Sequence, residues 1–186
     1  MYSQKIFMST KTIWNLDPTH SELNFKVRHL MISNVKGSFR DFSGTIESIG
    51  DDFSNATVKA VIQTGSIFTN NTDRDNHLRS GDFFDAAQFP EITFEGTSFR
   101  AKSDDEFELT GQLTMHGVTK EITLDVEFGG IGQDGYGQTK AGFSFKGKLN
   151  RADFGLTWNA LLEAGGVAVS EEVKIDGEVQ FVKSAA

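Results

Sequence analysis

The segment Thr69–Phe94 concentrates side chains that could do chemistry. Within it, Asp75 and His77 are residue types used in general acid–base catalysis, and Arg74 could hold an anion. Within the same segment, Phe83, Phe84 and Phe89 follow these polar residues directly. Because charges beside an apolar interior need partners, we expect an ordered lid whose own ion pairs pin it in place. Arg74, Asp75 and His77 are predicted to shape that lid.

The histidines show no spacing typical of a metal site. His20, His29, His77 and His116 lie on separate elements, without an HxH or HExxH pattern, so we predict no metal ion. No GxSxG nucleophile elbow and no phosphate-binding glycine loop occurs either, and we predict no catalytic residue. His29 shares an apolar face with Phe25. It is either a core histidine bonded to a backbone carbonyl or a contact for a ligand head group.

Composition predicts one globular domain without affinity for polyanions. The chain has 186 residues, a net charge of −8 and an isoelectric point near 5.0. No cluster of Lys and Arg stands out along the sequence, which argues against nucleic acid and equally against an anionic membrane surface. The absence of cysteine excludes disulfides, thiol catalysis and zinc–thiolate sites.

The N-terminal stretch predicts a cytoplasmic protein. It contains no apolar signal-peptide core and no small-residue cleavage site, so a periplasmic location would require a signal that has been removed. No segment approaches the roughly 18 apolar residues of a membrane-spanning helix. We therefore expect no integral membrane segment.

Alternation of apolar and polar residues dominates the rest of the chain and predicts about eight antiparallel strands, each with one dry face. A short helix is expected around residues 75–84, and a second helical stretch could lie around 160–164. Tight turns are expected at His116-Gly117 and within Gly129–Gly137. Such strands form either a sandwich or a barrel. The predicted inward-facing rows include Leu23 to His29, Phe107 to Met115, Ile122 to Phe128, Ala141 to Leu149 and Val173 to Phe181.

Glycine and phenylalanine content favour a barrel with a dry cavity. Gly111, Gly147 and Gly177 fall on inward faces, where glycine permits strong bending and is expected to leave room inside. The chain has 17 Phe against two Tyr and two Trp, so few aromatic side chains bring a polar tip into the interior. An eight-stranded barrel can hold one small ligand.

Five ordered motifs resemble those of the YceI-like family of bacterial lipid-binding proteins. They span nearly all of residues 12–182. The motifs are Asp17–Ser21 with Phe25–Leu30, Val35–Phe39 with Phe42–Gly44, Arg74–Leu78 with Phe83–Asp85 and Phe89–Phe94, Leu113–Lys120, and Asn150–Gly155.

This resemblance implies a lipocalin-like antiparallel barrel around an elongated hydrophobic pore. Members of the family hold polyisoprenoid chains, quinone tails or fatty-acid-type amphiphiles, several are exported, and homodimers occur. We accordingly expect an all-β, eight-stranded barrel over residues 12–183 and an N-terminal extension over residues 1–11.

The predicted function is non-enzymatic carriage or storage of a long apolar lipid, with no cofactor beyond that polyisoprenoid or quinone-like ligand. Two alternatives stay open. One is an enzyme or stress-response factor acting on an isoprenoid, with His29 or the Asp75–His77 pair as acid and base. The other is an interaction protein with a filled core. The predicted ligand-binding residues are Phe25, Val27, His29, Ile62, Arg74, Asp75, His77, Phe94, Leu113, Phe143, Phe145 and Trp158.

Overall fold

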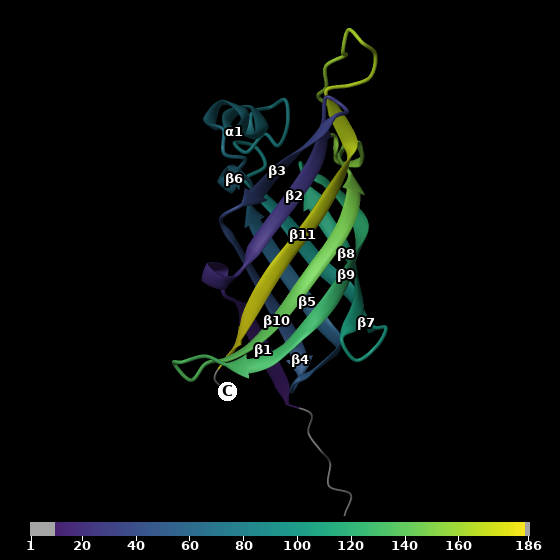
Figure 1. The fold of residues 1–186 in the computed structure, drawn as a ribbon. Helices are drawn as coiled ribbons and strands as arrows, with labels where there is room; N and C mark the ends of the chain where they lie inside the picture. The colour runs from purple at the N-terminus through teal and green to yellow at the C-terminus, as the bar shows by residue number, and fades with distance from the viewer. Residues whose placement is uncertain (1–9, 185–186) are drawn as a thin grey trace, which may run out of the picture.

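A closed antiparallel β-barrel with one short helix forms the molecule, as predicted (Figure 1). The computed structural model describes residues 10–184. The helix α1 spans Thr72–Arg79. The strands are β1 (Lys11–Leu16), β2 (Glu22–His29), β3 (Ser33–Phe39), β4 (Phe42–Ile49), β5 (Asp52–Gln63), β6 (Ile67–Phe68), β7 (Glu91–Ala101), β8 (Glu106–Met115), β9 (Val118–Gln133), β10 (Thr139–Asn150) and β11 (Val169–Lys183).

Eight strands close the barrel, in the circuit β1-β4-β5-β7-β8-β9-β10-β11 and back to β1. The long strand β11 has two partners on the same side. Its last residues pair with β1, where Trp14 faces Lys183, and its earlier residues pair with β2, where Val27 faces Val173. We call the β1 end the lower end and the α1 end the upper end. Strands β2, β3 and β6 therefore branch away from the closed circuit at the upper end (Figure 1).

Aromatic side chains fill the lower half. The Phe143 ring lies 5.1 Å from the Phe53 ring and 5.2 Å from the Phe128 ring, centroid to centroid, with Phe181 at 6.1 Å. Trp14 is completely buried beside Phe53, and its indole Nε1 donates a hydrogen bond to Ser48 Oγ at 2.8 Å. Burial of this many rings supplies a large share of the apolar area removed from water.

A polar network fastens the lower rim. The Asp17 carboxylate accepts hydrogen bonds from the Thr19 hydroxyl at 2.7 Å and from Lys140 Nζ at 3.0 Å, and lies 2.9 Å from His20 Nδ1. The Thr19 bond, followed by those from His20 and Lys140, holds the pKa of Asp17 far below its usual range despite some burial. Ion pairing with Asp17 and Asp134 in turn raises the pKa of Lys140.

The expectation that inward glycines leave room inside was wrong. A Cβ at Gly111 would collide with the ring of Phe94, and one at Gly177 would collide with the ring of Phe145 at 2.5 Å. A Cβ at Gly147 would likewise collide with the side chain of Leu124, at 2.6 Å. Each glycine thus accommodates a large side chain from a neighbouring strand, and the wall is packed where the sequence suggested gaps.

Local boundaries differ modestly from the predictions. Helix α1 begins at Thr72 because Asn71 caps it, its side chain accepting a hydrogen bond from the Arg74 amide at 3.0 Å. The stretch 160–164 is not helical but belongs to a loop with a bridge between Leu161 and Val167. The predicted turn at His116-Gly117 is confirmed, whereas β9 continues to Gln133 before it turns.

Candidate functional site: an apolar cavity under a helical lid

The upper half contains a small cavity bordered only by apolar surface. Its volume is about 110 Å³, and it lies between the strand branch β2–β3 and the segment around α1. No polar atom borders it. The surrounding residues are Phe25, Val27, Phe39, Leu78, Phe83, Phe84, Met115, Leu149, Arg151, Leu156, Val169, Val173 and Ile175.

Side chains, not strand pairing, close the wall beside this cavity. On the side away from β2, strand β3 pairs only with β6, at Ser38 and Phe39. Along Ser33–Gly37 the structure gives no strand partner on that side, within the described residues. The segment 69–90 lies beside this edge, and its Phe84 packs against Phe39 of β3 (Figure 1). We call this segment the lid.

The charged residues of the lid hold its backbone. Asp75 is buried, and its Oδ1 accepts hydrogen bonds from the Thr69 amide at 2.8 Å and the Thr69 hydroxyl. Arg74 donates from Nε to the same hydroxyl at 2.7 Å and from Nη2 to the Thr69 carbonyl. The expected ion-pair network is therefore mainly a hydrogen-bond network around Thr69. One His–Asp pair joins it, between His77 Nε2 and Asp82 Oδ2 at 2.8 Å.

Aromatic contacts seat the lid on the rest of the barrel. Phe84 packs edge-on against Phe39 of β3, with ring centroids 5.8 Å apart. Trp158, in the loop between β10 and β11, lies 4.8 Å from the His77 ring and 5.2 Å from the Phe83 ring. Two segments distant in sequence thus meet above the cavity through His77, Phe83 and Trp158.

Arg151 is a buried cation that organises the loop between β10 and β11. Its guanidinium donates to the carbonyl oxygens of Leu156, Trp158, Val169 and Ser170 at 2.7–3.2 Å. Burial lowers the pKa of Arg151, partly offset by Glu171. Only its aliphatic part borders the cavity. The guanidinium is thus directed to the backbone and not to a ligand.

The predicted ligand-binding residues fall into three groups. Phe25 and Val27 border the cavity. Ile62, Phe94, Leu113, Phe143 and Phe145 belong to the packed core, away from it. His29 lies at the upper end of β2 opposite Ser33, and Trp158, Arg74, Asp75 and His77 belong to the lid contacts.

Sequence reasoning missed most of the lid's apolar contribution. Leu78, Phe83 and Phe84 follow or end a polar helix and have no period-two pattern. Their signal was the abrupt change from charged to aromatic residues. Val173 and Ile175 were recognised as inward-facing, but the height at which β11 passes the cavity depends on strand register.

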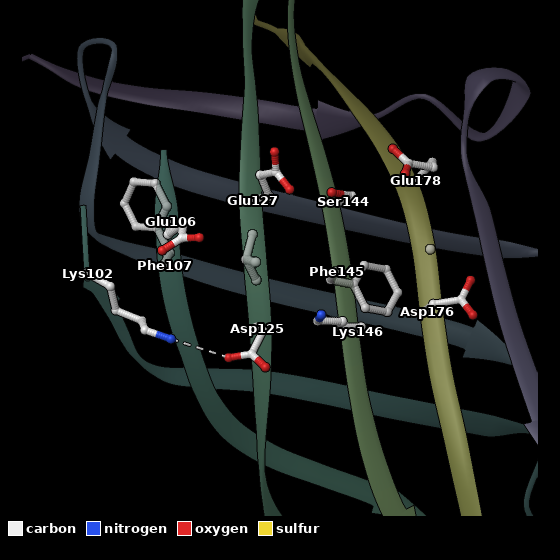
Figure 2. Close-up of a pocket in the computed structure, with 12 residues that line it drawn as sticks. Lys102, Glu106, Phe107, Asp125, Glu127, Ser144, Phe145, Lys146, Asp176 and Glu178 are labelled. Atoms are coloured by element: carbon white, nitrogen blue, oxygen red, sulfur yellow. Dashed lines mark ion pairs between the residues drawn. The ribbon is translucent and has the colours of Figure 1, made fainter. Parts of the chain in front are cut away.

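A larger concavity of about 550 Å³ lies on the outer wall over β8–β11 and has a different character. Figure 2 shows carboxylates of Glu106, Asp125, Glu127, Asp176 and Glu178 arrayed around it. Lys102 pairs with Asp125 at 3.6 Å. This open, charged surface offers little to an apolar ligand.

Within residues 10–184, no three His, Asp or Glu side chains gather as metal ligands would. Nor does any helix of that range have the length and apolarity needed to span a bilayer.

Comparison with known proteins identifies relatives along nearly the whole chain. The family described as "YceI-like domain" matches residues 14–181. The UPF0312 protein SA2479 of Staphylococcus aureus strain N315 is 42% identical over 171 residues, which cover 91% of this chain and 97% of the relative. The crystal structure of a YceI protein from Campylobacter jejuni, at 35% identity, superposes with a TM-score of 0.69 over 86% of this chain and 91% of that one.

A more distant structure has the same fold. It is a polyisoprenoid binding domain from Saccharophagus degradans, described as implicated in plant cell wall breakdown. The two chains are 20% identical, with a TM-score of 0.66 over 92% of this chain and 98% of the other.

Proposed function

This chain belongs to the YceI-like family, and we propose that it binds the apolar chain of a lipid as a non-enzymatic carrier or store. The observation that carries this proposal is the upper cavity, whose entire border is apolar. Burying hydrocarbon there would contribute about 25 cal/mol per Å² of apolar surface. The polyisoprenoid binding domain with the same fold supports an isoprenoid chain as one ligand class. Quinone tails and fatty-acid chains are the other ligand classes in this proposal.

The lipid's polar head stays outside in this proposal. Every buried side-chain nitrogen or oxygen in the described residues already has a hydrogen-bond partner. Arg151 is committed to backbone carbonyls, Asp75 to Thr69, and His77 to Asp82. A head group drawn into the cavity would lose its water without gaining partners.

A long chain requires the lid to move. The cavity of about 110 Å³ has room for only a short apolar segment. Leu78, Phe83 and Phe84 are the side chains whose displacement would extend it toward the unpaired edge of β3. Because side-chain packing alone closes this edge, the lid can open without breaking the strand circuit.

Native mass spectrometry of freshly purified protein, followed by solvent extraction, tests the proposal. We expect a discrete added mass that extracts as a lipid with a long apolar chain. The same spectrum reports whether the protein is the homodimer that the resemblance suggests. A bare protein mass, from cells shown to contain such lipids, would instead favour an interaction protein.

A pair of variants tests the location. Val27→Trp fills the cavity, whereas Val61→Trp makes the same change on the outer wall of β5, where Val61 lies beside Thr93. We expect Val27→Trp to lose the added mass and Val61→Trp to keep it. Retention by a folded Val27→Trp variant would place the lipid elsewhere.

A further inference from the structure

Exposed aliphatic side chains gather at the extreme upper end of the barrel. Leu30, Met31 and Ile32 connect β2 to β3, and Ile32 is 76% exposed. Leu161, in the loop between β10 and β11, is 87% exposed. The two loops touch, since the Leu30 amide donates to the Ala168 carbonyl at 2.8 Å (Figure 1). We call Leu30, Met31, Ile32 and Leu161 the apolar tip.

The backbone of the tip is strained. Leu30 has φ of 51° and Met31 has φ of 61°, two consecutive positive values as a type I′ turn requires. Such positions favour Asn and Gly, and bulky side chains occupy them at a cost. The turn at His116-Gly117 also has two consecutive positive φ values and uses a glycine. The tip thus keeps two large aliphatic side chains where turn stability disfavours them.

Four lysines line up on the outer wall below the tip. Strand register places Lys148 opposite Lys174, Lys174 opposite Lys26, and Lys26 opposite Lys36. Within residues 10–184 none of these four forms an ion pair. Like charges directly opposite each other on a sheet are destabilising. We call these four residues the lysine row. It lies about 13 Å from the tip, four residues along β2.

The wall is polarised along the barrel axis. Farther from the tip, a second row runs across β8, β9, β10, β11 and β2. In it Glu106 lies opposite Glu127, and Ser144 lies between Glu127 and Glu178 (Figure 2). Glu178 in turn lies opposite Glu22. The lysine row therefore lies nearer the tip than the glutamate row, in a chain whose net charge is −8.

We propose that the apolar tip and the lysine row dock the protein on a bilayer that contains anionic lipids. The aliphatic side chains would enter the acyl boundary, and the long lysine side chains would extend toward the head groups. Arg28 adds a cation between them and braces the turn by donating twice to the Met31 carbonyl, at 3.1 and 3.2 Å.

Four carboxylates of the β10–β11 connection and the start of β11 share this end, those of Asp153, Glu163, Glu171 and Glu172, and the lid carries Asp73, Asp82 and Asp85. Glu171 accepts a hydrogen bond from Asn150 at 3.5 Å. The lysine row and Arg28 bring five cations together on the wall formed by β10, β11, β2 and β3. The acidic sequence, which shows no cluster of Lys and Arg along the chain, argued against an anionic surface, but strand pairing gathers lysines that are far apart in sequence. The docking site is independent of whether the cavity holds lipid; if both hold, the lid lies at the membrane end of the barrel.

Vesicle flotation tests this proposal with the full chain. Wild type should float with phosphatidylcholine vesicles that contain phosphatidylglycerol, bind phosphatidylcholine alone much less, and release at high salt. Lys26→Gln with Lys174→Gln should lower partitioning at low salt at least about tenfold. Ile32→Asp should lower it about tenfold by removing an inserted side chain.

Matched controls make the same changes at other places. Lys59→Gln with Lys102→Gln alters the net charge equally, and Ile49→Asp changes an exposed isoleucine at the opposite end. Both control proteins should float like wild type. Equal losses in control and test variants, or no preference of wild type for anionic vesicles, would overturn the proposal.

Two further results separate this proposal from its rivals. Failure of wild type to float, together with a smaller particle size for Ile32→Asp, would make the tip a contact between copies and overturn docking. Vesicle binding by a protein that carries no lipid would support docking while removing support from the proposed carrier function. Failure of lipid-loaded protein to float would overturn docking and leave the proposed carrier function supported.

Discussion

The lower and upper halves of the barrel are closed by different means. In the lower half, β11 pairs with β1 to complete the strand circuit, and rings packed around Phe143 fill the interior. In the upper half, β11 turns to β2 instead, and side chains of the lid close the cavity beside the free edge of β3. The difference teaches that one sheet can be closed by strand pairing at its base and by side-chain packing at its other end.

The two halves also use polar side chains differently. At the base, Asp17 links the segment after β1 to β10 through Lys140, and it also contacts His20. At the upper end, Arg151 and Asp75 bind backbone groups of loops. Polar groups in the lower half therefore connect strands, whereas those in the upper half shape the segments around the cavity.

The largest effect is expected from removing a ring at the centre of the lower half. Phe143→Ala should lower the free energy of unfolding by about 4 kcal/mol, because it deletes a buried ring between several others. Phe84→Ala, in the half-buried lid, should cost about 1–2 kcal/mol and enlarge the cavity. Urea unfolding measures both. Equal losses for the two variants would mean that the halves are equally well packed.

A smaller and local effect is expected in the upper half when the buried cation is removed. Arg151→Met keeps the aliphatic part but leaves four carbonyls without their donor, at a cost of about 3 kcal/mol. Hydrogen exchange should accelerate in residues 155–168 and remain slow around Phe143. The exposed Arg100→Met is the control, with a loss below about 1 kcal/mol. Faster exchange throughout the barrel would contradict a local role.

The smallest effect is expected at the lower rim and depends on pH. The folded-state pKa of Asp17 lies below its ordinary value of 3.8, so its ionised form stabilises the fold above that pH. Asp17→Asn should cost about 1 kcal/mol at neutral pH. The difference from wild type should shrink as the pH falls below about 4. Asp104→Asn, in an exposed turn, serves as control. A difference that stays constant down to acidic pH would exclude this linkage.

Much of the barrel was predictable because its strands have one wet and one dry face. The row from Phe107 to Met115 alternates without interruption, and β8 spans Glu106–Met115. The resemblance carried by the motifs supplied the closed eight-stranded form. Alternation cannot show how β11 divides its pairing between β1 and β2, so the split between a closed base and a covered opening was not predictable.

The cavity was harder to predict than the fold, because alternation shows which face of a strand a residue lies on but not how neighbouring strands are aligned. Alternation identified Phe25, Val27 and Phe145 as inward-facing but gave no height along the barrel axis. Phe145 proved to fill the space over Gly177, whereas Phe25 and Val27 border the cavity. The lysine row was missed similarly, because Lys26, Lys36, Lys148 and Lys174 become neighbours only through register.

The pairing of β1 with β11 has a consequence for biosynthesis. Asn15 and Ser184, which are 169 positions apart, meet through a side-chain hydrogen bond of 2.8 Å. A ribosome releases the first of these strands long before the second exists. Until β11 emerges, β1 and β10 each lack a neighbour, and the rings beneath them stay exposed to water. Such non-local closure makes folding slow and leaves the nascent chain prone to aggregation, which makes it a natural client for chaperones.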